Sequence, residues 1–210
     1  MTVNTNAGSA KSTAKAKYHH GGLREALIDA AYQFVLESGG ENFSLADACR
    51  CAGVSTAAPY RHFKDRDEIL AEVCSRGFEE MTAMAQEAVR TKGEGTLEGI
   101  IAMGQTYVAF AVENQGLFRL MFGQNQSVSD VERVVEKGND CFGYLIEQIT
   151  IYCQANGLDS NADDDAVKLW TFVHGTASLL MDGKYDKVTP GLDVEQLIAS
   201  ATPQLLNQSD

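Results

Sequence analysis

Residues 44–63, SLADACRCAGVSTAAPYRHF, restrict the fold of this chain more than any other stretch. The pattern predicts two short helices separated by a tight turn. Ser44 and Ser55 are predicted to cap the two helices, because a hydroxyl accepts from the free amides of a first turn. Gly53 lies in the turn, where a residue that tolerates positive φ is needed. Together these features predict a helix-turn-helix, whose second helix, from Thr56 to Phe63, is shaped to enter a DNA major groove.

The side chains of that second helix divide by their expected contact with DNA. Methyl groups at the start of the helix can touch thymine methyls, whereas phosphate contacts position a protein without reading sequence. An alternative interpretation is that Tyr60 is a core residue of a three-helix domain. For Phe63 the interpretation as a core residue is favoured. The predicted base contacts are Thr56, Ala57 and Ala58; the phosphate contacts are Tyr60, Lys64 and Ser44; Arg61 and His62 fit either role, and Ser55 completes the set.

Apolar residues at helical spacing recur along the rest of the chain, and no segment shows the alternation of a strand. Pro59 removes an early backbone donor from the second motif helix, which predicts a stiff and short recognition helix. The sequence therefore predicts an all-α fold of about nine helices. Besides the two motif helices they span residues 22–38, 66–90, 96–114, 117–122, 128–155, a helix opened by Asp163–Asp165 that carries Trp170 and His174, and 194–206.

Charge is distributed unevenly along the chain, which has a net charge of −12. Residues 1–66 hold eight Lys and Arg against six Asp and Glu, whereas the remainder holds nine against 23. A mildly basic head on an acidic body favours DNA contact confined to the head. The first 17 residues read as a flexible basic arm, whose Lys11, Lys15, Lys17, and the nearby His19 and His20, suit either a minor groove or solvent.

Several classes of protein are disfavoured by composition. No apolar run is long enough to span a membrane, and the start of the chain lacks the apolar stretch of a signal peptide. Five cysteines without a disulfide-like framework fit a reducing cytoplasm. No cluster of metal ligands and no cofactor motif is visible. His174 has no Ser, Cys or carboxylate at one-turn spacing on its apolar face, so the alternative of a small helical enzyme that uses His174 as a base lacks support.

Two segments in order along the chain carry a resemblance to a known family. Residues 23–73 resemble the DNA-binding domain of the TetR family of bacterial transcriptional regulators. Residues 18–27, YHHGGLREAL, are similar to the leading segment of one subgroup, and LWTFVHGTASLL is similar to that subgroup's C-terminal domain, named for a Trp-His-Gly triplet. Ala48, the Cys49–Cys51 pair, Ala58 and Pro59 depart from the usual pattern. The matching positions are Ala30, Ala31, Phe34, Gly39, Ala52–Ser55, Tyr60, Phe63 and Asp67–Leu70, and then Trp170, His174 and Gly175.

The resemblance implies a homodimer whose body holds a pocket for a small apolar effector. It implies a basic arm at 1–17, a helix-turn-helix domain at 18–66 and an effector-binding and dimerisation domain at 67–210. Each pocket candidate has the alternative interpretation of an ordinary core residue. For His174 the favoured interpretation is a buried histidine whose hydrogen bonds are satisfied within the core. The pocket candidates are Met103, Tyr107, Phe110, Phe118, Met121, Phe122, Phe142, Trp170 and His174; the dimer candidates are Trp170, Val173, Ala177, Leu180, Leu197, Ile198, Ala201 and Leu205.

The function implied is a repressor that binds a palindromic operator and leaves it when the effector binds. The alternative is an effector-independent master regulator or activator of the same fold, which differs in having a solid body. A body without a cavity of about 300 Å³ or more would favour that alternative.

Overall fold

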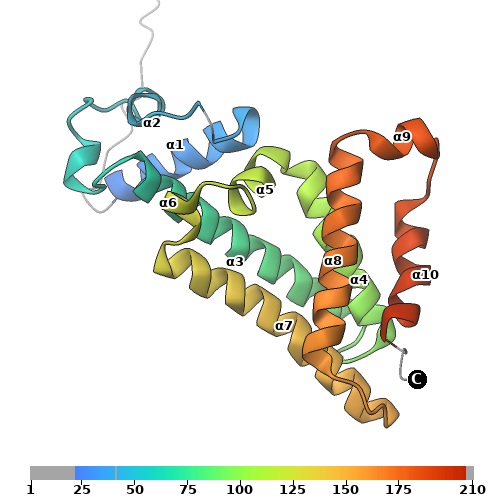
Figure 1. Cartoon of the computed structure of the whole chain (residues 1–210). Helices are drawn as coiled ribbons and strands as arrows, with labels where there is room; N and C mark the ends of the chain where they lie inside the picture. Colours follow the sequence, from blue (N-terminus) through green and yellow to red (C-terminus); the bar gives the residue numbers. More distant parts are fainter. Residues whose placement is uncertain (1–21, 41, 207–210) are drawn as a thin grey trace, which may run out of the picture.

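The computed structural model describes residues 22–40 and 42–206, and within them every regular element is a helix (Figure 1). This confirms the all-α prediction. The predicted arm, its histidines and the segment 18–21 lie outside the described residues. The elements are α1 (Leu23–Ser38), α2 (Leu45–Ala52), the 3₁₀ turn η1 (Pro59–Arg61), α3 (Arg66–Lys92), α4 (Leu97–Glu113), α5 (Gln115–Met121), α6 (Gln126–Ser129), α7 (Glu132–Asn156), α8 (Ala162–Met181), α9 (Lys184–Val188) and α10 (Val194–Leu206).

The first motif helix, α2, begins and ends as predicted. Ser44 Oγ accepts from the Asp47 amide at 3.2 Å, and the Asp47 carboxylate accepts from the Ser44 amide at 3.0 Å, which together form a capping box. Hydrogen bonds from Ser44 hold the pKa of Asp47 below its usual range. Gly53 ends the helix with φ 66°, in the left-handed region that favours glycine.

The second motif helix is not the α-helix that the sequence predicted. The segment from Ser55 to Ala58 is a turn, closed by the Ala58 amide donating to the Ser55 carbonyl at 3.0 Å, and only Pro59–Arg61 is helical, as a 3₁₀ turn. Pro59 has no amide to donate to the Ser55 carbonyl, which accepts from the Ala58 amide instead, and the next backbone bonds run to the Ala58 and Pro59 carbonyls. Ser55 therefore caps no helix, which corrects that prediction.

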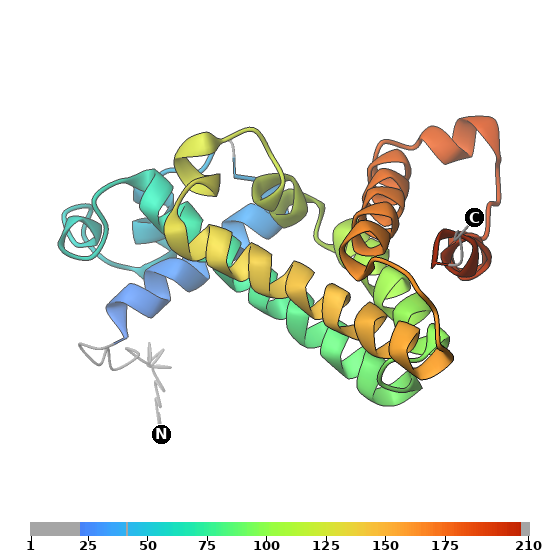
Figure 2. The ribbon, with the colours of Figure 1, turned by 60° about the horizontal axis from the view of Figure 1, so that its bottom comes forward.

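The long helix α3 connects the head, which we define as α1, α2 and η1, to the body, which comprises α4 to α10. Asp65 caps α3 by accepting from the Glu68 amide at 2.9 Å. Figures 1 and 2 show α3 and α7 running side by side away from the head, with α4 returning toward it. The helices α8 and α10 lie on the other side of α4 and pack on α4 and on each other.

Two differences from the predicted helices fall in the body. The segment predicted as one helix from residue 128 is divided, because Val131 adopts an extended conformation and its carbonyl starts α7 anew. The separate turn α6 buries Val128 against the core. A short helix, α9, lies between α8 and α10 and was not predicted; it buries none of its residues and so leaves no apolar pattern in the sequence.

The apolar core runs without interruption from the head into the body. One cluster joins Leu27 and Val35 of α1 to Phe118 of α5 and to Val173 of α8, and a second cluster closes the far end of the body around Ile149. None of the described helices is long and apolar enough to cross a membrane. The described residues contain no group of three or more His, Cys, Asp or Glu placed to hold a metal ion.

Candidate DNA-binding surface and ligand cavity

Most of the predicted DNA-contact residues are exposed on the segment from Ser55 to Lys64. Ser55, Thr56 and Ala57 are exposed on the turn before η1, and Arg61, His62 and Lys64 are exposed after it. Tyr60 is 65% exposed, which excludes the core reading, whereas Phe63 is 2% exposed and is a core residue as expected. Ala58 is half-buried, and the Ser44 side chain is engaged in the α2 cap.

The cations of this surface differ in their partners from the cations of α1, α2 and the start of α3. Arg24 pairs with Glu72, Arg50 pairs with Asp47, and Arg66 donates to the Phe43 carbonyl at 2.7 Å. Among the described residues, neither Arg61 nor Lys64 forms an ion pair. The Lys64 amide donates to the Glu68 carboxylate and so ties the segment to α3. Two exposed cations beside an exposed tyrosine are groups that bind phosphates.

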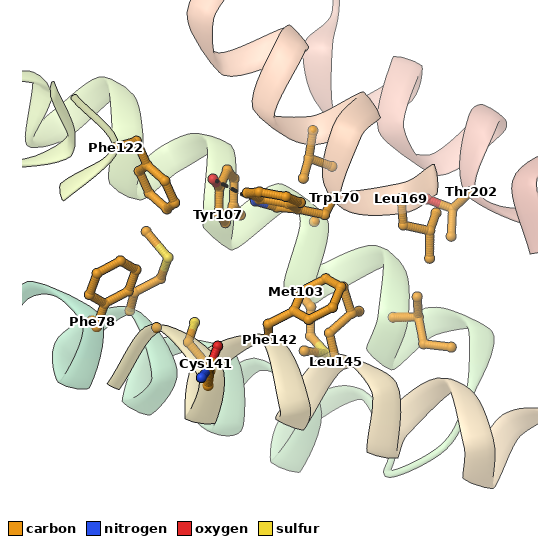
Figure 3. Close-up of a pocket in the computed structure, with 16 residues that line it drawn as sticks. Phe78, Met103, Tyr107, Phe122, Cys141, Phe142, Leu145, Leu169, Trp170 and Thr202 are labelled. Atoms are coloured by element: carbon orange, nitrogen blue, oxygen red, sulfur yellow. Dashed lines mark hydrogen bonds between the residues drawn. The ribbon is translucent and has the colours of Figure 1, made fainter. Parts of the chain in front are cut away.

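A cavity of about 380 Å³ lies in the body between α3, α4, α7, α8 and α10 (Figure 3). Its wall is predominantly apolar, and it exceeds the volume of about 300 Å³ at which small-molecule pockets begin. The lining residues are Phe78, Met81, Ile100, Met103, Gly104, Tyr107, Phe122, Gly138, Asn139, Cys141, Phe142, Leu145, Leu169, Trp170, Val173 and Thr202.

Five of the nine predicted pocket residues line this cavity: Met103, Tyr107, Phe122, Phe142 and Trp170. The other four do not. Phe110 of α4 is buried in the core, and Met121 fills the space that Gly77 leaves on α3. Phe118 packs against Phe122 with the two rings tilted and their centroids 4.7 Å apart. His174 lies behind Tyr107.

The contribution of α3 to the cavity wall and most of that of α7 do not follow from the sequence. Phe78 and Met81 belong to the helix predicted over 66–90, and their three-residue spacing places them on one face. Gly138 sits opposite the Phe78 ring, and its missing side chain helps leave the space open. Cys141 and Asn139 carry no sequence signal for a cavity.

Tyr107 is the centre of a hydrogen-bonded group at the cavity wall. Its hydroxyl accepts from Trp170 Nε1 at 3.2 Å (Figure 3, dashed line) and shares a hydrogen bond with His174 Nδ1 at 2.9 Å. The neighbouring rings of Phe118 and Phe122 surround this group, with the Phe118 ring edge-on to Tyr107. His174 is therefore a hydrogen-bonded histidine within an aromatic cluster.

Burial favours the uncharged forms of the ionisable groups at the cavity. It raises the pKa of the Tyr107 hydroxyl and of the Cys141 thiol above their ordinary values, and it lowers the pKa of the His174 imidazole. No Lys, Arg, His, Asp or Glu is among the lining residues. The cavity is thus a neutral, apolar space at physiological pH.

The predicted dimer residues divide between the inside and the outside of the protomer. Val173, Ala177 and Ile198 are buried within the protomer, where Val173 and Ile198 pack against Gly104 of α4, and their place in a dimer interface stays a prediction. Leu180, Leu197, Ala201 and Leu205 are half-buried, and Trp170 is 37% exposed. The outer face of α8 instead presents Val167, Thr171, Gly175 and Leu179, residues that the sequence analysis did not select.

Two connections join the body to the head besides α3 itself. Gly116 of α5 approaches α1 so closely that an added Cβ would lie 2.2 Å from the Val35 carbonyl oxygen. Glu72 of α3 receives Arg24 of α1 and Arg133 of α7, the latter at 3.1 Å. Arg133 also donates to the Glu68 carbonyl at 3.0 Å. The head is therefore held directly by α5, and α7 is linked to it indirectly through Glu72 of α3.

This architecture, with a helix-turn-helix-like head joined by one long helix to a hollow helical body, defines a class of DNA-binding regulators. Comparison with known proteins identifies the family. The family model "Tetracyclin repressor-like, C-terminal domain" matches residues 100–204, which is half of the chain.

An uncharacterised HTH-type transcriptional regulator of Haemophilus influenzae is 28% identical over 148 residues, covering 64% of this chain and 71% of that protein. Among solved structures, a protein of unknown function from Rhodococcus sp. RHA1 is 31% identical with a TM-score of 0.78, over 91% of this chain and 97% of its own. The transcriptional regulator FadR of Bacillus subtilis in complex with stearoyl-CoA has a TM-score of 0.68 at 15% identity, and the match covers 89% of this chain and 99% of that chain.

The chain belongs to the TetR family of transcriptional regulators. It is a DNA-binding regulator and not an enzyme, as the sequence analysis predicted.

Proposed function

We propose that this protein is a homodimeric repressor that binds a palindromic operator and leaves it when a small apolar molecule enters the body. The observation that carries the proposal is the presence in one chain of an exposed, cationic head surface and of a neutral cavity of about 380 Å³ in the body. In the proposed domain organisation, residues 1–17 are a basic arm, residues 18–66 bind DNA, and residues 67–210 bind the effector and the second subunit.

The proposed DNA contact uses the turn and η1 rather than a full recognition helix. Thr56 and Ala57 face base edges, and Tyr60, Arg61 and Lys64 bind the flanking phosphates. In a dimer, two such surfaces would enter successive major grooves about 34 Å apart. The acidic body keeps DNA on the head, because its charge repels the phosphate backbone.

The proposed switch changes the distance between the two heads. A ligand in the cavity touches α3 through Phe78 and Met81 and touches α5 near its end through Phe122. Both helices also contact the head, so a ligand that favours one arrangement of α3 and α5 favours one spacing of the heads. A coupling of about 1–3 kcal/mol changes operator affinity by about 5–150-fold.

The proposed dimer forms through the outer faces of α8 and α10. Val167 is 49% exposed and Leu179 is 44% exposed on α8, and an added Cβ at Gly175 between them would meet no other atom. The half-buried Leu197, Ala201 and Leu205 follow one another at four-residue spacing on α10. Packing these faces against a second copy would form a four-helix bundle.

Selection of bound fragments from genomic DNA, followed by binding at several salt concentrations, tests the proposal. We expect an inverted repeat whose affinity falls steeply as salt rises. Lys64→Ala should weaken binding to all sites and lower the salt slope by about 2, because each of the two subunits loses one phosphate contact. A set of enriched fragments without an inverted repeat would contradict the palindromic operator, and operator affinity unchanged by every cavity-binding molecule would favour the effector-independent alternative.

A further inference from the structure

The size of the cavity bounds the size of its ligand. An engineered apolar cavity of about 150 Å³ holds one benzene molecule. By that measure the cavity of about 380 Å³ accommodates a molecule of roughly 15 carbon atoms, the size of two or three rings.

The lining also bounds the charge of the ligand. No lining side chain carries a charge at neutral pH, and beyond residue 66 the chain holds 23 Asp and Glu against nine Lys and Arg. A carboxylate or phosphate in this cavity would lose its hydration without gaining a cation, and burying an unpaired charge is strongly unfavourable. The anionic class of ligand is therefore disfavoured by the residues that form the wall.

Among the hydrogen-bonding groups of the wall, one is placed to bind a polar group of the ligand. Thr202 Oγ1 already donates to the Ile198 carbonyl at 2.8 Å, and Asn139 is exposed at the solvent side of the wall. Tyr107 Oη has two partners, Trp170 and His174, whereas a phenol has one proton and two lone pairs to use. One hydrogen-bonding position on Tyr107 thus remains, fixed in direction by the two partners.

We propose that the cavity binds an uncharged, largely hydrocarbon molecule whose single hydroxyl group hydrogen-bonds Tyr107 Oη, and that it rejects carboxylates and acyl-CoA. A hydroxyl both donates and accepts, so it fits the open position in either tautomer of His174. The inference rests on the proposed effector role of the cavity. It sets this chain apart from the structurally similar FadR, which holds stearoyl-CoA.

The chain supplies its own reporter for the test. Its one tryptophan, Trp170, lies in the cavity wall, so its fluorescence reports on occupancy of this cavity. Three probes share one framework: 4-phenylphenol, biphenyl and biphenyl-4-carboxylate. Binding to the full-length protein should be strongest for 4-phenylphenol, about 2–10-fold weaker for biphenyl, and about 100-fold or more weaker for the carboxylate.

The Tyr107→Phe variant tests the anchor. In this variant the affinities for 4-phenylphenol and biphenyl should become nearly equal. Continued binding of biphenyl would show that the variant is folded. Tyr144→Phe, which removes a tyrosine hydroxyl from a residue of α7 that does not line the cavity, should keep the wild-type ratio. The wild-type probe series alone decides the ligand class if Tyr107→Phe does not fold.

The outcomes separate this inference from the proposed function. A carboxylate that binds as tightly as the phenol would overturn the neutral class and leave an effector cavity in place. An unchanged ratio in Tyr107→Phe would overturn the anchor. If none of the three probes changes Trp170 fluorescence or binds by calorimetry, the cavity is not a ligand site, and the effector part of the proposed function fails with it.

Discussion

At the scale of single residues, Ser44 and Asp47 hold the first motif helix in place through a reciprocal pair of hydrogen bonds. Ser44→Ala removes the oxygen that satisfies a first-turn amide, so the free energy of unfolding should fall by about 1 kcal/mol. Urea unfolding followed by circular dichroism measures this change. Ser38→Ala is the control, because its exposed hydroxyl donates only to the Phe34 carbonyl at the end of α1, and it should change stability by less than about 0.5 kcal/mol. Equal effects of the two substitutions would contradict the role of the cap.

His174 gives the body a specific dependence on pH. Burial lowers the pKa of its imidazole in the folded protein below the ordinary value, so the unfolded chain binds its proton more readily. Stability should therefore fall as pH drops from about 6.5, the ordinary pKa of histidine, toward the lower folded value. Thermal unfolding at about pH 7.5 and about pH 5.5 measures the effect.

A second variant assigns that dependence to the residue. His174→Gln keeps a hydrogen-bonding side chain beside Tyr107 and removes the titration, so the variant should show a smaller loss of stability between the two pH values. Asp47 and Asp182, whose pKa values are held low by hydrogen bonds, lose their contributions only under more acidic conditions. An identical pH profile for the wild type and the variant would exclude His174 as the cause.

At the scale of elements, α5 is the short helix that touches both the cavity and the head. Gly116 permits its contact with α1, since a Cβ there would collide with the Val35 carbonyl, which is backbone and cannot rotate away. Gly116→Ala should destabilise the protein by about 1–3 kcal/mol, as overpacking does, and should lower operator affinity. Chemical denaturation and operator titration measure the two effects.

Gly143 provides the matched control for that substitution. It lies in the middle of α7, and an added Cβ would meet no atom within 4 Å. Gly143→Ala should leave operator binding unchanged and raise stability by up to about 1 kcal/mol, because alanine favours the helix over glycine. If both alanines act alike, the close approach of α5 to α1 has no special role.

The long helices could be predicted from sequence because each buries a continuous apolar face. The range of α10 was predicted to the residue and that of α3 to within two, whereas η1 and α9 were not. Their conformations depend on Pro59 and on surface packing rather than on a periodic core pattern. For the same reason Tyr107 and Trp170 were identified as cavity candidates from their type, but Phe78 and Cys141 came to the wall only through the way α3 and α7 pack.

At the scale of the whole molecule, the arrangement separates three surfaces by chemistry. The cationic surface lies on the head, the neutral cavity lies inside the body, and the apolar outer faces of α8 and α10 lie at the side of the body away from α3 (Figures 1 and 2). A dimer through α8 and α10 would leave both heads free for DNA. It would also place the two cavities next to the interface, since Trp170 and Val173 belong to α8.

Disrupting the proposed interface should therefore remove DNA binding without touching the head. Leu179→Glu places a charge on the outer face of α8, where an unpaired carboxylate buried against a second copy would be costly. Light scattering during size-exclusion chromatography should show a shift from dimer to monomer, and affinity for an inverted repeat should fall because one head binds one half-site.

Val135→Glu on α7 is the matched control: Val135 is 46% exposed against 44% for Leu179, and it lies outside α8 and α10. We expect this control to remain dimeric and to bind the operator normally. A dimeric Leu179→Glu protein with wild-type affinity would mean that the subunits, if they associate, do so through a different face.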